Sequence, residues 1–376
     1  MTVMQVLART GSPLEGGPSP TPCHRIPALA CVGGRLVVVF DVRTSPLDLP
    51  GPNGMAVLTS DDLGATWTAP RWLRRPEGRW GCGDASLIAL DDGSLLAWYV
   101  GSDGGSFWDD QRPGEGWTLW VARSLDGGRT WAHREVSEGL WPDDAGCLFA
   151  SSGNGTQLDG GRLLQPVAVR RRGGQVRYVV MAISDDRGDS WRLGAPVEGC
   201  DETKVAQLPD GRVVLHSRAT PSRLAAVSTD GGETFSSPSP DIPDPGCNGG
   251  FVSLPDGRLA CTLVYPEGAT TDSVVDLPDP TGGRGASSGP VWSERRNLVL
   301  RVGLPGAWGE PVVLDPGPAA YSVAAVVPDG RLAVAWEYGA YEGIRFALVS
   351  PPSPTAGLGD GVGVVGGAAG RAGAPG

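Results

Sequence analysis

SDDLGATW, at residues 60–67, is the stretch of this chain that decides its fold. Its form, Ser-x-Asp-x-Gly-x-(Thr/Ser)-(Trp/Phe), returns as SLDGGRTW (124–131), SDDRGDSW (184–191) and STDGGETF (228–235), with GLPGAW (303–308) as an eroded fifth copy. An apolar stretch precedes each full copy, which predicts a strand that runs into a tight turn. In such a turn the Asp accepts hydrogen bonds from backbone amides, the Gly supplies a positive φ, and the aromatic ring packs back on the sheet.

A second repeat is a hairpin in which a glycine turn, mostly of Asp-Gly type, joins two apolar strands. It occurs six times, as VGGRLVVVF (from Val32), DDGSLLAWY (from Asp91), DGGRLLQPV (from Asp159), PDGRVVLHS (from Pro209), PDGRLACTL (from Pro255) and PDGRLAVAW (from Pro328). Asp-Gly between hydrophobic runs is a strong hairpin signal. The spacing leaves room for one four-stranded antiparallel sheet per turn. We therefore predict an all-β, six-bladed β-propeller of four-stranded antiparallel blades.

The two ends of the chain are expected to behave differently. Residues 3–8 can pair with the last predicted strand, residues 344–349, and so close the ring. Residues 1–350 are then one propeller domain. Residues 351–376 are rich in Gly, Ala and Pro and hold almost no large apolar side chain, which predicts a disordered tail.

The composition disfavours several functional classes. With 31 Lys and Arg against 42 Asp and Glu, the net charge of −11 argues against nucleic acid or an anionic membrane as the partner. No apolar run is long enough for an ordinary transmembrane helix. Seven scattered Cys without a CxxC motif, and three His, disfavour a zinc site and a disulfide framework. The N-terminus lacks the features of a secretory signal, so we expect the protein to be cytoplasmic. We also expect a monomer that uses no metal or cofactor.

Several candidate functional residues lie in the first two predicted blades. Arg25 lies in RIPAL at a strand start, Arg43 and Asp48 share a loop rich in Pro and Gly, and Asp84 lies in GCGDAS. Each of them, taken alone, is also compatible with an exposed strand end or an ordinary surface loop.

Further polar residues follow in the later blades. Glu202 and Arg218 flank one predicted hairpin, and their spacing places them at the same end of adjacent strands. Arg295 lies in RRNL, and Tyr321 precedes the last PDG hairpin. Three arginines from three blades (Arg25, Arg218 and Arg295) are costly to bury together unless an anion occupies them, which favours an anion receptor over a structural role.

In this order the motifs resemble those of bacterial exo-α-sialidases (neuraminidases), six-bladed propellers with aspartate-box repeats. The resemblance runs from about Arg25 to Val349. It implies that Arg25, Arg218 and Arg295 bind the carboxylate of sialic acid, and that Arg43 and Asp84 lie near the sugar. It also implies that Asp48 is the acid/base and that Tyr321 is the nucleophile, with Glu202 as its base.

The chain departs from the family pattern at several positions. Val42 and Thr44 stand where Gly and Pro are usual, and Ala85 replaces the Pro that follows the family's aspartate. His216 replaces an Asn two residues before Arg218. Asn154 stands where relatives often carry a Glu.

The residue types suit the reaction that the resemblance implies. A carboxylate nucleophile would be repelled by the carboxylate of the substrate, whereas a neutral phenol is not, and sialidases with a Tyr nucleophile are a known exception among glycosidases. A phenol has a reference pKa near 10 and therefore needs a base, which Glu202 supplies. Asp48 would protonate the leaving oxygen and then deprotonate water. The expected partners are sialylated glycans on glycoproteins, glycolipids or oligosaccharides.

Two alternatives stay open at this point. One is a hydrolase or transferase for a related 2-keto sugar acid, which would keep the carboxylate receptor and change the rest of the pocket. The other is a non-catalytic sugar-binding propeller. The linkage preference and the role of the Trp-rich segment 107–117 cannot be read from the sequence.

Overall fold

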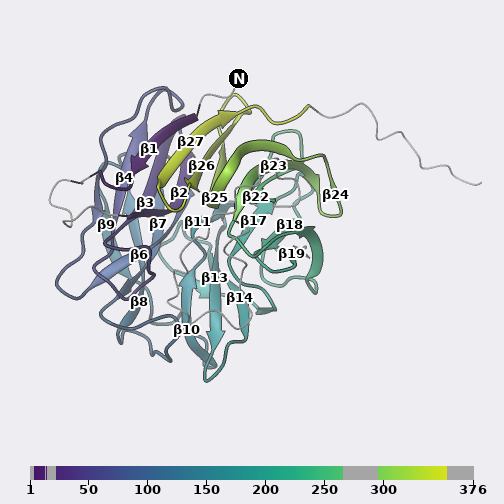
Figure 1. Cartoon of the computed structure of the whole chain (residues 1–376). Coiled ribbons are helices and arrows are strands. Elements are labelled where there is room, and N and C mark those ends of the chain that lie inside the picture. Colours follow the sequence, from purple (N-terminus) through teal and green to yellow (C-terminus); the bar gives the residue numbers. More distant parts are fainter. Residues whose placement is uncertain (1–3, 13, 15–22, 266–294, 354–376) are drawn as a thin grey trace, which may run out of the picture.

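The computed structural model describes residues 4–12, 14, 23–265 and 295–353. All regular elements in these ranges are β-strands, arranged as a propeller-like ring of small, mostly antiparallel sheets (Figure 1). The described residues contain no helix long and apolar enough to cross a membrane. The prediction of an all-β propeller is therefore confirmed. The predicted tail, apart from its first three residues, lies outside the described residues.

Four sheets are each built mainly from consecutive strands. The first holds β2 (Cys23–Val32), β3 (Arg35–Arg43), β4 (Gly54–Ser60) and β5 (Arg71–Arg74). The second holds β6 (Gly81–Ala89), β7 (Leu95–Ser102), β8 (Trp117–Ser124) and β9 (Ala132–Glu135), with β11 (Gly153–Asn154) parallel to β6. The third holds β10 (Ala145–Ala150), β12 (Thr156–Gln157), β13 (Leu163–Arg171), β14 (Arg177–Ser184), β15 (Arg192–Leu193) and β16 (Val197–Glu198). The fourth holds β17 (Thr203–Gln207), β18 (Val213–Ser217), β19 (Ser222–Ser228) and β20 (Ser239–Pro243).

The fifth sheet has eight strands because one long strand is shared. It holds β21 (Gly250–Ser253), β22 (Leu259–Val264), β23 (Arg296–Leu304), β24 (Ala307–Trp308), β25 (Val312–Val326), β26 (Leu332–Tyr338), β27 (Gly343–Val349) and β1 (Met4–Arg9). The first part of β25, through Pro318, pairs with β23, with an irregularity in the ladder after Asp315. Its second part, from Ala319, pairs with β26.

The predicted hairpins and ring closure are both observed. All six glycine turns join antiparallel strand pairs: β2–β3, β6–β7, β12–β13, β17–β18, β21–β22 and β25–β26. β1 pairs with β27, with Met4 opposite Ala347, and the two strands lie side by side in Figure 1. The first and last strands that the structure describes are thus hydrogen-bonded to each other.

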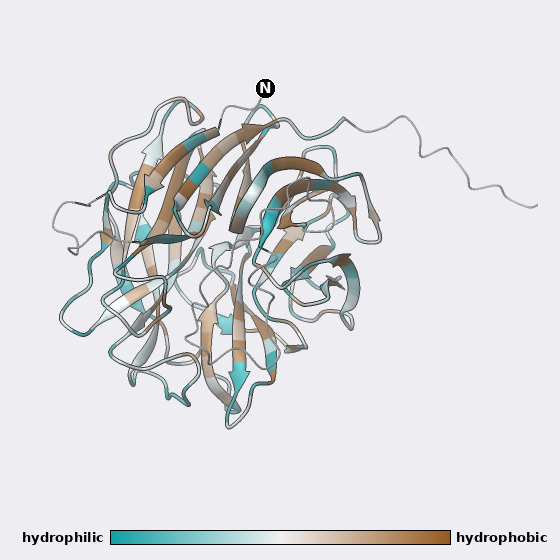
Figure 2. Cartoon of the chain, viewed as in Figure 1, coloured by the Kyte–Doolittle hydropathy of each residue, from teal (hydrophilic) through white to brown (hydrophobic). Residues whose placement is uncertain are grey.

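The core lies between neighbouring sheets, so the central strands are apolar on both faces (Figure 2). In β3, Val38 and Phe40 pack toward Phe346 of β27. Val37 and Val39 of the same strand pack toward Tyr99 of β7. Burial on both faces explains why such strands read as continuous apolar runs rather than alternating ones.

The aspartate turns have the predicted hydrogen bonds. In the first, Ser60 Oγ accepts from the Gly64 amide at 2.8 Å, and Asp62 accepts from the amide and hydroxyl of Thr66 at 2.8 and 2.6 Å. These donors hold the pKa of Asp62 down at about 2. The same pattern recurs around Asp126, Asp186 and Asp230.

Each full aspartate turn also contacts the preceding sheet around the ring. Trp67 packs edge-on against Phe346 at 5.0 Å, and Trp191 against Trp98 at 4.7 Å. The eroded copy is held differently, because Trp308 Nε1 and the Gly306 amide both donate at 2.8 Å to Asp241 in the fourth sheet. The repeat therefore fastens one sheet to the next.

Gly64 offers a test of this fastening. It has a φ of +90°, and an added Cβ would stand 2.4 Å from the buried Phe346 ring. Gly93 has a φ of +86° with open space around it, so it isolates the backbone cost. We expect Gly93→Ala to lower the free energy of unfolding by about 1–2 kcal/mol, and Gly64→Ala by about 2–3 kcal/mol more. Denaturant unfolding of both variants measures the difference, and equal losses would contradict the proposed packing.

Candidate active site

Three arginines from different strands gather around one tyrosine. Arg25 lies in β2, Arg218 directly follows β18, and Arg295 directly precedes β23. Their guanidinium carbons lie 5.9, 5.8 and 5.4 Å from the centroid of the Tyr321 ring. The convergence predicted for these arginines is observed.

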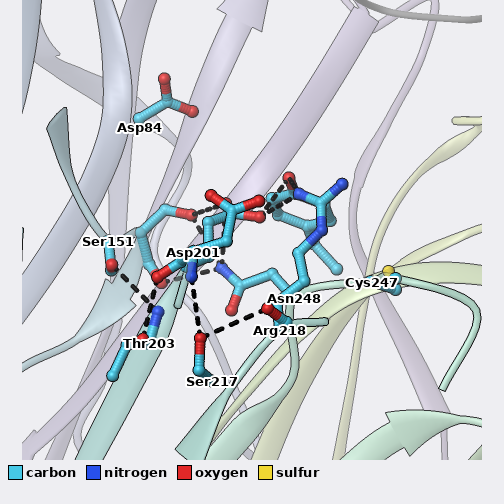
Figure 3. A network of polar contacts seen from close by, with 12 residues as sticks. Asp84, Ser151, Asp201, Thr203, Ser217, Arg218, Cys247 and Asn248 are labelled. Atoms are coloured by element: carbon cyan, nitrogen blue, oxygen red, sulfur yellow. Dashed lines mark hydrogen bonds and ion pairs between the residues drawn. The ribbon is translucent and has the colours of Figure 1, made fainter. Parts of the chain in front are cut away.

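Tyr321, Glu202 and Arg218 form a closed triangle of hydrogen bonds. The Tyr321 hydroxyl donates to Glu202 Oε2 at 2.7 Å. Arg218 Nη1 donates to the same carboxylate oxygen and, at 2.8 Å, to the Tyr321 hydroxyl oxygen. Figure 3 shows Arg218 in this network, with Asn248 and Asp201 close by.

The protonation states of this pair follow from their surroundings. Burial alone would raise the pKa of Glu202, but the charge of Arg218 and the Tyr321 hydroxyl outweigh it and lower that pKa. Burial, together with the charge of Glu202, raises the pKa of Tyr321 well above 10, although Arg218 opposes the shift. At neutral pH the pair is therefore a phenol beside a carboxylate, as a nucleophile and its base require.

The hairpin between β17 and β18 places Glu202 and Arg218 together. Thr203 pairs with Ser217, and the Arg218 amide donates to the Glu202 carbonyl at 2.7 Å. The predicted position of these two residues at one end of adjacent strands is thus observed. His216 lies in the same strand and is fully buried. It contacts Asp241 at 3.0 Å through Nε2 and accepts from Arg223 at Nδ1.

Asp48, Arg43 and Asp84 form the second half of the site. Arg43 Nη1 donates to Asp48 Oδ1 at 2.7 Å, and Nη2 lies 3.7 Å from Asp84 Oδ1. Arg25 Nη1 also reaches Asp48 Oδ1, at 3.4 Å, which links the two halves. The Asp48 side chain is 39 % exposed whereas Arg43 is 1 % exposed, so Asp48 is the more accessible of the two. Burial and the neighbouring Asp41 carboxylate raise the pKa of Asp84 well above its usual range.

The structure brings all eight predicted residues into one connected group. These are Arg25, Arg43, Asp48, Asp84, Glu202, Arg218, Arg295 and Tyr321. The described residues contain no group of three His, Cys, Asp or Glu that could hold a metal ion. The absence of a metal or cofactor from the reaction stays a prediction.

Two buried carboxylates for which no role was predicted hold this group in place. Glu337 Oε1 accepts from Arg25 Nε at 3.1 Å and from the Ile26 amide at 2.9 Å, while Oε2 accepts from the Tyr321 amide at 3.2 Å. Asp41 Oδ2 accepts from Arg43 Nε and Nη2 at 3.0 and 2.7 Å. The available signal was a carboxylate inside an otherwise apolar strand, as in LAVAWEY.

Tyr341 was missed as well. Its ring lies 4.2 Å from the Arg25 guanidinium carbon, and its hydroxyl accepts from Arg295 Nη1 at 3.4 Å. A φ of +61° lets it turn toward the arginines after β26 has ended. No sequence pattern marked this residue.

The Trp-rich segment 107–117 and Asn154 do not belong to this group of eight residues. Arg170 anchors the segment 107–117 by donating to the Phe107 carbonyl at 2.8 Å and to the Asp109 carbonyl at 2.7 Å. Asn154 lines a cavity of about 600 Å³ whose lining includes none of the eight site residues.

Comparison with known proteins identifies the family of the chain. Residues 81–334 match the BNR repeat-like domain family. This chain belongs to that family. The predicted resemblance to sialidase-like propellers is confirmed.

Individual relatives are similar over part of their length. The chain is 32 % identical over 349 residues to the sialidase of Micromonospora viridifaciens, covering 87 % of this chain and 51 % of that protein. It is 30 % identical over 239 residues to Sialidase-3 of Rattus norvegicus, covering 53 % of this chain and 57 % of that one. The chain thus spans little more than half the length of these relatives.

Solved structures share the fold. The Hadza microbial sialidase Hz136 superposes with a TM-score of 0.72 at 22 % identity, covering 87 % of this chain and 66 % of that one. The Trypanosoma rangeli sialidase superposes with a TM-score of 0.69 at 17 % identity, covering 93 % of this chain and 59 % of that one.

The Glu337 contacts predict a stability effect. Glu337→Gln removes the charge that compensates the buried Arg25, so we expect the free energy of unfolding to fall by about 3–5 kcal/mol. The exposed Glu310→Gln serves as the matched control and should change it by less than about 0.5 kcal/mol. Urea unfolding at neutral pH measures both. Equal stability of the Glu337 variant and the native chain would show that Arg25 does not depend on this carboxylate.

Proposed function

We propose that this chain is an exo-α-sialidase that hydrolyses terminal α-linked sialic acids from glycoconjugates, with retention of configuration and a covalent tyrosyl intermediate. The observation that carries the proposal is the 2.7 Å hydrogen bond from Tyr321 to Glu202 inside a ring of three arginines. That arrangement joins a receptor for a carboxylate to a neutral nucleophile with its own base.

Binding begins with the carboxylate of the sugar. Guanidinium groups bind carboxylates through charge-assisted and partly bidentate hydrogen bonds, and Arg25, Arg218 and Arg295 surround one place where this can happen. A carboxylate on Arg25 takes up donors that otherwise reach Asp48. Asp48 is then available to the glycosidic oxygen, while Arg43 and Asp84 lie where hydroxyl groups of the ring can bind.

Two displacements at the anomeric carbon complete the reaction. In the first, the Tyr321 oxygen bonds to that carbon, its proton passes to Glu202, and Asp48 gives a proton to the departing oxygen. In the second, Asp48 takes a proton from water, the water oxygen displaces Tyr321, and Glu202 returns the proton to the phenolate. Arg218, which donates to both partners, stabilises the charge that shifts between them.

We also propose that the ring has six blades. The long strand β25 would serve two of them, with residues 312–315 as the outer strand of the fifth blade and residues 319–326 as the inner strand of the sixth. The cavity of about 600 Å³ supports this count, because six different inner strands contribute to its lining: Leu29, Leu87, Gln157, Val205, Val252 and Ala325.

Removal of the nucleophile tests the mechanism. We expect Tyr321→Phe to lower kcat at least about 100-fold toward the 4-methylumbelliferyl α-glycoside of N-acetylneuraminic acid, because the phenol oxygen forms the intermediate. Tyr178→Phe, which removes a hydroxyl bonded to Asp144, is the matched control and should leave kcat unchanged. NMR of the first-formed anomer checks retention. Turnover unaffected by Tyr321→Phe would refute the assignment of the nucleophile.

The leaving group distinguishes the role of Asp48. We expect Asp48→Ala to lower kcat/KM about 10²–10⁴-fold for a sialyl-lactose, whose sugar leaving group needs a proton. The loss should be far smaller for the 4-methylumbelliferyl glycoside, whose phenol leaves without help. Equal losses on both substrates would contradict general-acid catalysis. A folded native chain that turns over only deaminated sialic acid would favour a related 2-keto sugar acid as substrate.

A further inference from the structure

Lys204 is the only lysine of the chain. Asn248 connects it to Glu202 of the site. Lys204 belongs to β17, two residues after Glu202, and its side chain is fully buried. Its Cε would stand 2.8 Å from a Cβ added to Gly153, a point that Val323 also approaches. The lysine therefore extends between strands of different sheets, and only the absence of a side chain at Gly153 leaves room for it.

The side-chain amide of Asn248 connects Lys204 to Glu202, and Ser152 Oγ donates to the same Glu202 oxygen, Oε1, at 3.4 Å. Lys204 Nζ donates to Asn248 Oδ1 at 2.8 Å. The Asn248 Nδ2 group donates to Ser152 Oγ at 2.9 Å and to Glu202 Oε1 at 3.4 Å. Because an ammonium group only donates, it requires the amide oxygen, which turns the amide nitrogen toward Glu202. Figure 3 labels Asn248 in this network of polar contacts.

The charges around Lys204 are few. Glu202 attracts its ammonium, the buried Arg223 repels it, and the Cys261 thiol is the remaining titratable neighbour. Burial lowers the pKa of Lys204 to about 7, and the charge of Glu202 counteracts part of that shift. The next residue, Val205, lines the cavity that lies away from the site residues.

We propose that Lys204 is a positioning residue for the reaction: through Asn248 it helps to fix Glu202 Oε1, so that Oε2 stays aimed at the Tyr321 hydroxyl, and its charge adds to that of Arg218 in keeping Glu202 ionised. This inference rests on the proposed roles of Glu202 and Tyr321. It assigns Lys204 to the chemical step and not to substrate binding, since the arginines of the receptor do not contact it.

Being the only lysine, Lys204 can be observed directly. Biosynthetic incorporation of lysine labelled with ¹³C at Cε gives one side-chain signal, whose shift against pH reports the charge of Lys204. By reciprocal linkage, loss of the Glu202 charge must disfavour the ammonium form. We expect Glu202→Gln to lower the titration midpoint by at least about 0.5 pH units. Asp201→Asn is the control, because Asp201 precedes Glu202 in the sequence but pairs with Arg177 at 2.5 Å. This variant should leave the titration midpoint of Lys204 unchanged.

An unchanged midpoint in Glu202→Gln would overturn the proposal. The titration needs no turnover, so it can fail or succeed independently of sialidase activity. A coupled Lys204 in a chain that hydrolyses no sialoside would refute the proposed function and leave the coupling intact.

Kinetics of Lys204→Met test the catalytic consequence. We expect kcat to fall about tenfold or more with KM within twofold. We also expect kcat of the native chain to decline as Lys204 loses its proton near pH 7, and Lys204→Met to lack this decline. Lys204→Arg, which keeps the cation, should recover part of kcat. Native kcat and an unchanged pH profile in folded Lys204→Met would overturn the proposal. If neither variant folds, the titration of the native chain and Glu202→Gln decides.

Discussion

One buried carboxylate, Glu337, holds together the closure of the ring and the centre of the site. It binds Arg25 and the Ile26 amide in the first sheet and the Tyr321 amide in the last. β2 packs against β25 and β26 at the place where β1 completes the ring. A buried carboxylate is costly unless its oxygens are satisfied, and here the groups that satisfy it come from two sheets. The contacts that join the first sheet to the last therefore also position Arg25 and Tyr321 in the site.

The sheets place functional side chains through local irregularities. The ladders slip between Arg25 and Ala28, between Gly83 and Ser86, between Arg296 and Leu298, and between Ala319 and Ser322. Positive φ values occur at the first three of these slips, at Ile26, Asp84 and Asn297. A β-bulge bends the strand and re-aims a side chain. Regular ladders hold the core, and interruptions at corresponding places in different sheets turn polar residues toward one centre.

This division explains how far the sequence could be interpreted. The turns were predictable because Asp-Gly pairs and aspartate motifs act within eight residues, and so was the pairing of Glu202 with Arg218 across one hairpin. No role could be assigned to Glu337, because its partners lie on another strand that is distant in the sequence. No role could be assigned to Asp41 either, because its partner Arg43 lies two residues further along a strand whose sequence is mostly apolar. Lys204 gave no sign of its position, since its contact with Asn248 joins residues 44 apart in the chain.

The compensation of charge also explains why the site can exist before a substrate binds. Asp41, Glu202 and Glu337 each accept from a buried arginine, and each also accepts from a further group that fixes its direction: the Asp84 amide, the Tyr321 hydroxyl and the Ile26 amide. The side chains of these arginines are thus oriented when the chain folds, so substrate binding does not have to supply the free energy for orienting them. A preorganised receptor of this kind stabilises an incoming anion without rearranging its dipoles. Replacement of such a carboxylate by an apolar group would remove the cause of the arginine's orientation, so the stability of the ring and the function of the centre cannot be separated at these positions.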